Sequence, residues 1–127
     1  MYHVAIHHQN HMAFSVQSQN HSLSIDAQGD TGISPLDALL AALGSCIGVF
    51  VRNYAKNTSI NLENFTIHTR AELSADRPIR FKDINVTIEF ADKTIDEKRR
   101  ASILRFIKNC PVHNTLAMQP SITISIA

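Results

Sequence analysis

The sequence predicts a single α+β domain over residues 1–127, with its elements in the order βββ-α-ββ-α-β. The first observation is a long, almost wholly apolar helical stretch in the first half of the chain. The second is that segments of alternating apolar and polar residues, typical of half-buried strands, lie on both sides of that stretch. The third is a second, well-capped helical segment near the end. A chain of 127 residues is long enough for one domain with a real core.

Three short strands are expected before the long helix, over Met1–His7, Met12–Gln17 and His21–Ala27. In each of them apolar residues alternate with other residues. The segments between the strands are polar and turn-like, and Gln28–Gly32 forms a loop that leads into the helix. This pattern indicates a short antiparallel meander.

The long helix is expected from Ser34 to Lys56. Ser34 suits the N-cap, and Pro35 suits the first helical position. From Leu36 to Val51 nearly every residue is apolar or small, and a helix that is apolar all round is expected to be buried on all sides. The stretch is short for a membrane span, which needs about 20 apolar residues.

Covering such a helix is difficult for one chain of this length, so we expect an intertwined homodimer with two long central helices side by side and antiparallel sheets outside them. Gly44 and Gly48 lie on one helix face, one turn apart, and leave room for another backbone to approach closely. Because each Gly inside a helix costs about 1 kcal/mol relative to Ala, the pair indicates a close contact, which we interpret as a helix–helix seam. Cys46 lies between the two glycines.

The second half of the chain contains two strands, two helices and a closing strand. The expected ranges are Phe65–Ser74 and Phe81–Phe90 for the strands, a helix that starts with a capping box at Thr94–Glu97, a short helix over Val112–Met118, and a strand over Ser121–Ala127. Pro111 ends the first of these helices, because the residue before a proline is driven out of the helical region.

Composition excludes several classes of function. The net charge is +1, and no run of Lys and Arg is dense enough for a nucleic-acid surface. There is no charged-then-apolar leader and no transmembrane run, so the expected location is cytoplasmic, with no membrane partner. The two cysteines, Cys46 and Cys110, lie far apart in the sequence. In a reducing cytosol such a pair is either inert or redox-active.

Each cysteine has two interpretations from the residues alone. With Pro111 as the first residue of a new helical turn, Cys110 occupies its N-cap, where unpaired N–H groups and the helix dipole favour the thiolate. The alternative is a helix stop with a buried, inert thiol. Cys46 lies in the middle of a helix, so it is either a buried packing residue or a thiol activated by a tertiary partner.

A metal site is the weaker alternative. His7, His8 and His11, or Cys110 with His113, have spacings that ligands adopt. Zinc needs three or four ligands with supporting contacts, and the sequence contains no CxxC or HExxH motif. We therefore expect neither a metal nor a cofactor.

Three stretches resemble the OsmC/Ohr family. They are Ser34–Cys46, the segment from Arg77-Pro78 to Phe81 that leads into an alternating strand, and Cys110-Pro111-Val-His-Asn-Thr-Leu116. The resemblance covers nearly the whole chain, with matching element order. It implies an OsmC-like, intertwined α+β homodimer with two long central helices and active sites at the subunit interface.

The resemblance also implies thiol-dependent reduction of organic hydroperoxides in oxidative-stress defence, with Cys46 as the peroxidatic and Cys110 as the resolving cysteine. Cys46 would attack the O–O bond and become a sulfenic acid, and Cys110 would condense with it to a disulfide. A dithiol reductant would then restore both thiols. Apolar surroundings would favour alkyl or lipid hydroperoxides over hydrogen peroxide.

The sequence departs from the family at the residues that activate the peroxidatic thiol. Better-characterised hydroperoxide reductases of the family carry an Arg before the long helix and a Glu directly after its Pro. Here no Arg or Lys precedes Arg52, and Leu36 follows the proline. A His of the N-terminal segment, or Arg52, Arg70 or Arg80 from either subunit, is the expected source of positive charge. The departure supports an alternative function, a non-catalytic dimer of the same fold that binds a small apolar ligand or senses redox state.

Overall fold

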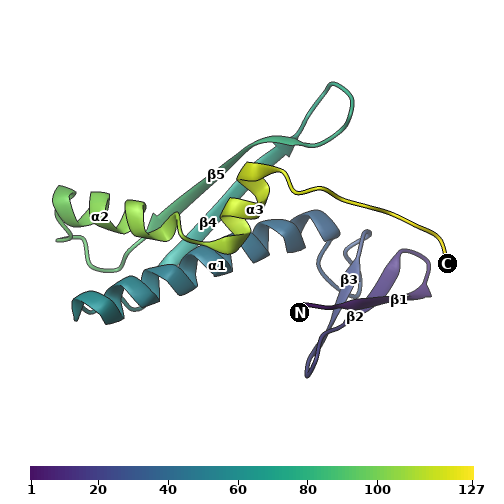
Figure 1. Ribbon diagram of the computed structural model, residues 1–127, viewed down its shortest axis with the longest axis horizontal. Coiled ribbons are helices and arrows are strands. Elements are labelled where there is room, and N and C mark those ends of the chain that lie inside the picture. Colours follow the sequence, from purple (N-terminus) through teal and green to yellow (C-terminus); the bar gives the residue numbers. More distant parts are fainter. The chain divides into compact units, whose positions relative to one another are not determined.

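In the computed structural model, which describes residues 1–127, three strands precede a long helix, and two strands and two helices follow it (Figure 1). The predicted α+β class is confirmed. The chain divides into two compact units, Met1–Ala41 and Ala42–Ala127. Helix α1 (Pro35–Thr58) begins in the first unit and continues into the second.

The first unit contains an antiparallel sheet in the order β1-β2-β3, made of β1 (Ala5–Asn10), β2 (Ala13–Gln17) and β3 (Ser22–Asp26). The first strand begins and ends later than predicted, because the polar residues after His7 pair with β2 instead of forming the turn. His8 lies opposite Phe14, with 5.3 Å between their ring centroids. The turn falls at His11, which has a φ of 46°.

Asp26, at the end of β3, organises the loop that leads into α1. Its Oδ1 accepts a hydrogen bond from the Gln28 N–H at 2.9 Å, and its Oδ2 accepts from the N–H and the hydroxyl of Thr31 at 3.1 and 3.0 Å. The hydrogen bond from Gln28 is the main cause that lowers the pKa of this carboxyl. Next to the loop, a Cβ on Gly32 would overlap the backbone carbonyl of Ser24, so only glycine fits there.

Helix α1 begins as the sequence predicts, since the Ser34 hydroxyl accepts the Asp37 N–H at 3.1 Å. The expectation that α1 is buried on all sides is wrong within one chain. Val49 is 55% exposed, and Leu36 is 42% exposed. One side of the helix is buried; its residues are Leu43, Gly44, Ile47, Val51, Tyr54 and Ala55. By length and composition alone α1 could cross a membrane, a test that the core helix of a soluble protein also passes.

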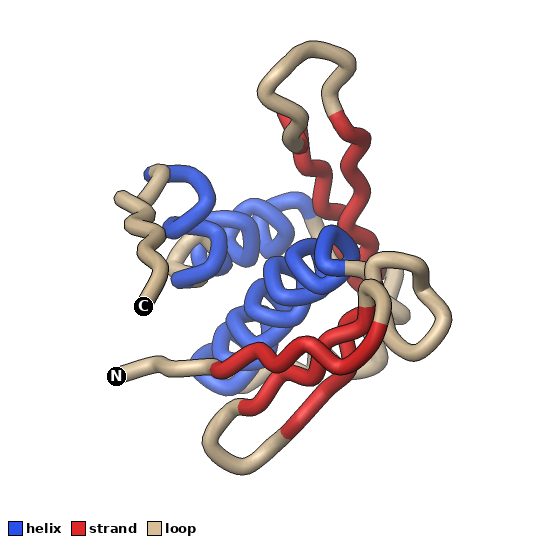
Figure 2. The backbone as a smooth tube through the Cα atoms, turned by 90° about the vertical axis from the view of Figure 1, so that its right-hand side faces the viewer, coloured by secondary structure: helices blue, strands red, loops and turns tan.

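The glycines of α1 contact a strand and not another helix. β4 (Thr66–Leu73) and β5 (Phe81–Glu89) form an antiparallel hairpin. A Cβ on Gly44 would lie 2.8 Å from Thr69 Oγ1, and one on Gly48 would lie 3.3 Å from Ile67 Cδ1. The predicted helix–helix seam is therefore a helix–strand contact, which forms because small residues let α1 approach β4. Figure 2 shows α1 running between this hairpin and the other two helices.

Helix α2 (Glu97–Ile107) packs against the C-terminal half of α1. The ring of Phe106 lies 6.1 Å from that of Phe50 and 5.6 Å from that of Tyr54. Asp96 is the N-cap, and its Oδ1 accepts the Arg99 N–H at 2.8 Å. The predicted capping box at Thr94 is therefore wrong, because Asp caps a helix as well as Thr does and Thr94 instead donates to Asp92.

The short helix predicted near the end is confirmed as α3 (Pro111–Met118). The predicted closing strand over Ser121–Ala127 is wrong. That segment is extended and pairs with no strand of the chain, as the C-terminal end of the ribbon in Figure 1 shows. Ile122, Ile124 and Ile126 are consequently almost fully exposed. A strand requires a hydrogen-bonding partner, and the strands of this chain do not supply one.

Candidate active site: a pair of adjacent thiols

Cys46 and Cys110 meet inside the second unit. Cys46 lies in the middle of α1, and Cys110 is the N-cap of α3. Both are free cysteines, and the Cys46 side chain lies close enough to the Cys110 thiol to raise its pKa. The structure therefore brings together the two residues that the sequence singled out.

The two thiols differ in burial. Cys110 is 0% exposed, whereas Cys46 is partly exposed. Cys46 shares its helix face with Phe50, which contacts α2, and lies about half a turn from the face of Gly44 and Gly48. The glycines therefore admit β4 and do not open a path to the thiol. Apolar side chains that include Phe106 and Val112 belong to the same cluster.

The N-cap position of Cys110 is confirmed, and of the two interpretations left open by the sequence the net pKa shift favours the buried thiol. Burial, followed by the neighbouring Cys46 side chain, raises the pKa of the Cys110 thiol. A negative charge on the Cys46 sulfur raises it further. The backbone N–H groups of His113 and Val112 act in the opposite direction, and the His113 N–H lies 3.3 Å from the Cys110 sulfur. Desolvation and the neighbouring sulfur outweigh the helix N-terminus, so Cys110 is held as a protonated thiol.

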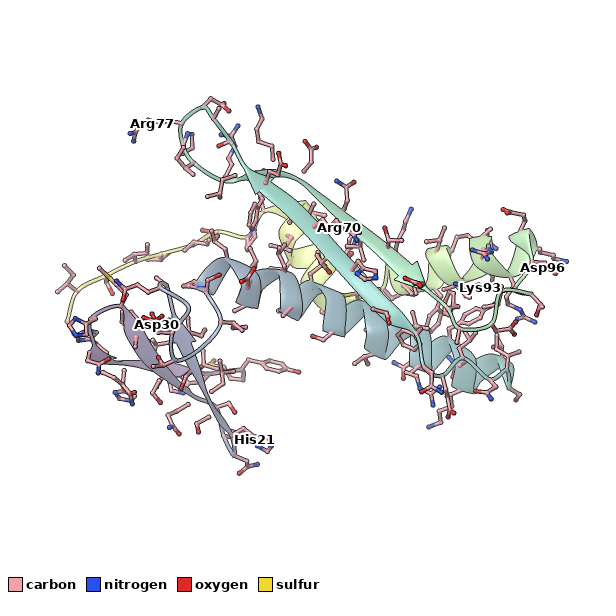
Figure 3. All side chains as sticks on the ribbon, turned by 180° about the vertical axis from the view of Figure 1, so that it is seen from behind. His21, Asp30, Arg70, Arg77, Lys93 and Asp96 are labelled. Atoms are coloured by element: carbon pink, nitrogen blue, oxygen red, sulfur yellow. The ribbon has the colours of Figure 1, made fainter.

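The arginines expected to activate Cys46 bind other groups. Arg52 donates to the carbonyl of Leu62 at 2.7 Å and lies 3.6 Å from Glu63. Arg80 donates to the carbonyl of Pro78 at 2.6 Å. Arg70 lies on the β4–β5 hairpin, away from the tip that carries Arg77 (Figure 3). None of these guanidinium groups hydrogen-bonds a cysteine within the chain.

The residues considered as metal ligands do not converge. No group of three or more His, Cys, Asp and Glu side chains is placed to hold a metal ion. His113 binds Cys110 through its backbone N–H, while its ring Nδ1 lies 3.1 Å from Asn114 Oδ1. His8 contacts the carbonyl of His11 at 2.9 Å through Nε2.

Two surface hollows lie away from the cysteines. One, of about 540 Å³, follows the outer side of the β4–β5 hairpin and is lined mainly by polar residues, including Arg70 and Glu72. The other, of about 790 Å³, lies along the first residues of the chain and the β2–β3 turn. Neither is lined by Cys46 or Cys110.

Sequence reasoning found both sulfurs and also the backbone N–H groups of α3 that face Cys110, because a proline directly after a cysteine marks the first turn of a helix. The extent of burial, which decides the direction of the pKa shift, depends on packing against α1 and α2. No local pattern contains that information.

These features define an α+β protein with two adjacent free thiols, one contributed by the long helix and the other by a helix N-terminus. The family model of the OsmC-like proteins matches residues 27–125, and the chain belongs to this family. No curated protein sequence matches the chain.

Solved structures of the same fold cover most of the chain. An OsmC-like protein from Mycoplasma pneumoniae is 21% identical, with a TM-score of 0.80, and the match covers 92% of this chain and 87% of that one. The organic hydroperoxide resistance protein OhrB of Bacillus subtilis is 20% identical, with a TM-score of 0.63 and coverage of 94% and 92%. An organic hydroperoxide resistance protein from Legionella pneumophila is 17% identical, with a TM-score of 0.65 and coverage of 91% and 88%. At these identities the matches establish the fold.

Proposed function

We propose that this protein is a thiol-dependent peroxidase that reduces organic hydroperoxides, with Cys46 as the peroxidatic and Cys110 as the resolving cysteine. The observation that carries the proposal is the pair of neighbouring free cysteines, of which one is partly exposed and the other buried. Two structural neighbours are named for resistance to organic hydroperoxides, which supports the substrate class.

The roles follow from exposure and ionisation. The nucleophile in peroxide reduction is a thiolate, and it must be reached by the substrate. Cys46 is the more exposed of the two cysteines, and the raised pKa of Cys110 keeps that thiol protonated. The Cys46 thiolate attacks one oxygen of ROOH, the O–O bond breaks, and RO⁻ leaves and is protonated to ROH. Cys46 becomes a sulfenic acid.

Cys110 then completes the oxidation. Its sulfur attacks the Cys46 sulfenic sulfur, the S–O bond breaks, and water leaves with the Cys110 proton. The two side chains are already neighbours, so this step needs little rearrangement. A dithiol reductant then exchanges with the Cys46–Cys110 disulfide and becomes a disulfide itself. Because the surrounding side chains are apolar, alkyl or lipid hydroperoxides are the substrates that fit.

We further propose that the working form is a homodimer in the cytoplasm. The exposed apolar side of α1 and the three unpaired C-terminal isoleucines leave a large apolar surface on a single chain, and such surfaces mark protein interfaces. A second copy would also supply the positive charge that Arg52 and Arg80 do not give to Cys46 within a chain. Two free cysteines suit a reducing compartment.

The test is peroxide consumption by the purified, reduced chain with dithiothreitol as the electron donor. We expect cumene hydroperoxide to be consumed faster than hydrogen peroxide, and mass spectrometry to detect a Cys46–Cys110 disulfide. Cys46→Ser should fall to the background rate, since it removes the attacking sulfur. Without dithiothreitol, Cys110→Ser should react once and accumulate a sulfenic acid that dimedone labels, because no second thiol is present to condense with it. A Cys46→Ser variant as fast as the parent would contradict the proposal, and a mass of one chain in solution would contradict the dimer.

One observation favours the alternative of a non-catalytic dimer that binds an apolar ligand or senses redox state. No guanidinium group hydrogen-bonds Cys46 within the chain, and Leu36 stands where the family's acid is expected. This function predicts a disulfide that forms slowly with any oxidant and negligible turnover with thiol reductants. The same peroxide assay separates the two functions.

A further inference from the structure

The two sulfurs of the site offer very different access to an incoming thiol. Thiol–disulfide exchange proceeds when a thiolate attacks one sulfur of the disulfide and expels the other, so the rate depends on which sulfur can be reached. Cys110 is 0% exposed, sealed beneath the start of α3, whereas Cys46 is partly exposed on α1. A reductant that approaches from solvent therefore meets the Cys46 sulfur first.

The ionisation of the leaving group acts in the opposite direction. A thiol of lower pKa leaves faster, and burial followed by the neighbouring Cys46 side chain raises the pKa of Cys110. This effect alone would disfavour Cys110 as the leaving group. The nucleophilicity of an attacking thiol changes with its pKa with a Brønsted coefficient of about 0.4–0.5, and a dependence of similar size for the leaving thiol changes the rate only about threefold per pKa unit. A sulfur that is reached only when its surroundings open is slowed by the rarity of opening, which in a packed core amounts to orders of magnitude. Access therefore decides the direction.

Part of the pKa elevation also disappears during the step itself. Once Cys46 is bonded to the reductant, it carries no negative charge that could repel the Cys110 thiolate. The N–H groups of His113 and Val112 remain, and the His113 N–H already lies 3.3 Å from the Cys110 sulfur. The N-terminus of α3 thus provides hydrogen bonds to the negative charge that develops on Cys110.

We propose that the reducing thiol attacks Cys46 and that Cys110 is the leaving group. The backbone N–H groups in the first turn of α3 stabilise the departing Cys110 thiolate. In balanced form, the reductant thiolate bonds to the Cys46 sulfur, the Cys46–Cys110 bond breaks, and Cys110 departs with the electron pair and takes up a proton. The second thiol of the reductant then attacks its own sulfur in the mixed disulfide, and Cys46 leaves. The inference deepens the proposed function, because it assigns the regeneration of the same thiol pair.

The experiment uses the full chain oxidised with diamide, an electron acceptor, so that it does not depend on peroxidase activity. Glutathione is added, the reaction is quenched with acid at early times, and peptic peptides are mapped by mass spectrometry. We expect glutathione on Cys46 in at least about tenfold excess over Cys110 at the earliest times, as the orders-of-magnitude difference in access requires. Equal labelling, or more label on Cys110, would overturn the inference.

Variants at His113 separate the backbone from the side chain. His113→Pro removes the N–H and should slow the loss of the disulfide, whereas His113→Ala keeps the N–H and should slow it less. If His113→Pro does not fold, the labelling of the parent protein still decides the question. Active peroxide reduction with label on Cys110 would remove this inference alone. Label on Cys46 in a protein without peroxidase activity would remove the proposed function alone.

Discussion

Gly44 and Gly48 form a matched pair that tests the packing of α1 on β4. A Cβ at Gly44 would lie 2.8 Å from Thr69 Oγ1, a distance that forces a neighbour to move. A Cβ at Gly48 would lie 3.3 Å from Ile67 Cδ1, the flexible end of a side chain, and 3.7 Å from Phe65 Cε2. The two positions lie on the same helix face, but only Gly48 has nearly enough room for alanine.

The expected effects have opposite signs. Replacing a helical Gly by Ala stabilises by about 1 kcal/mol through helix propensity, and overpacking costs about 1–3 kcal/mol. Gly48→Ala should therefore raise the free energy of unfolding by about 0.5 kcal/mol, because only a small displacement opposes the gain. Gly44→Ala should lower it by about 1 kcal/mol, since the contact with Thr69 outweighs the gain. Near the melting temperature, 1 kcal/mol corresponds to a shift of about 4 °C.

The assay is thermal unfolding followed by circular dichroism at one fixed protein concentration. Thr69→Ala provides the control, because it removes the atom that Gly44→Ala would contact. In the Thr69→Ala background, Gly44→Ala should become neutral or stabilising, and the difference measures the coupling between the two positions. Equal stabilisation by Gly44→Ala and Gly48→Ala in the parent would refute the packing of α1 against Thr69.

Two further predictions concern pH and the core. Asp26 has a pKa below its ordinary value in the folded state. Its contribution to stability is therefore complete above the unfolded-state pKa and is lost as the pH falls through the lower folded-state pKa. The melting temperature of the parent should exceed that of Asp26→Asn at pH 6, and the difference between the two melting temperatures should shrink towards pH 3. Asp92 shifts in the same direction but is present in both proteins, so it cancels. Ile103 is 1% exposed, so Ile103→Ala should lower the free energy of unfolding, measured in urea, by about 2–5 kcal/mol. Its neighbour Leu104 is 55% exposed, and Leu104→Ala should lower it by less than about 1 kcal/mol. Equal losses in the two variants would contradict the burial of Ile103.

The fold was predictable wherever a local pattern carries the information. Ser34, Pro35 and the apolar run mark α1, and alternating residues mark the strands of both sheets. The start of α2 was misplaced by two residues, because Thr94 and Asp96 are both good caps and local sequence does not choose between them. The closing strand was predicted from the alternating isoleucines, but a strand also needs an edge to pair with, which the sequence does not reveal.

The sequence identified the two cysteines of the candidate site but did not predict their surroundings. The motif around Cys110 and Pro111 identifies a helix N-cap, and the structure confirms it. The sequence left the direction of the Cys110 pKa shift open, because that direction is set by desolvation and by the Cys46 side chain, both of which depend on contacts between distant segments. The glycine pair was assigned to the wrong neighbour for the same reason. The spacing of the two glycines shows that one face of the helix lacks side chains, but it does not show which element packs against that face.

The unequal burial of the two thiols also bears on irreversible damage. A sulfenic acid that meets a second peroxide is converted to a sulfinic acid, which ordinary thiols do not reverse. In the proposed reaction the cysteine on α1, which is partly exposed, would form that sulfenic acid, while its neighbour at the start of α3 is buried away from the oxidant. Disulfide formation would then compete directly with irreversible oxidation of the exposed cysteine.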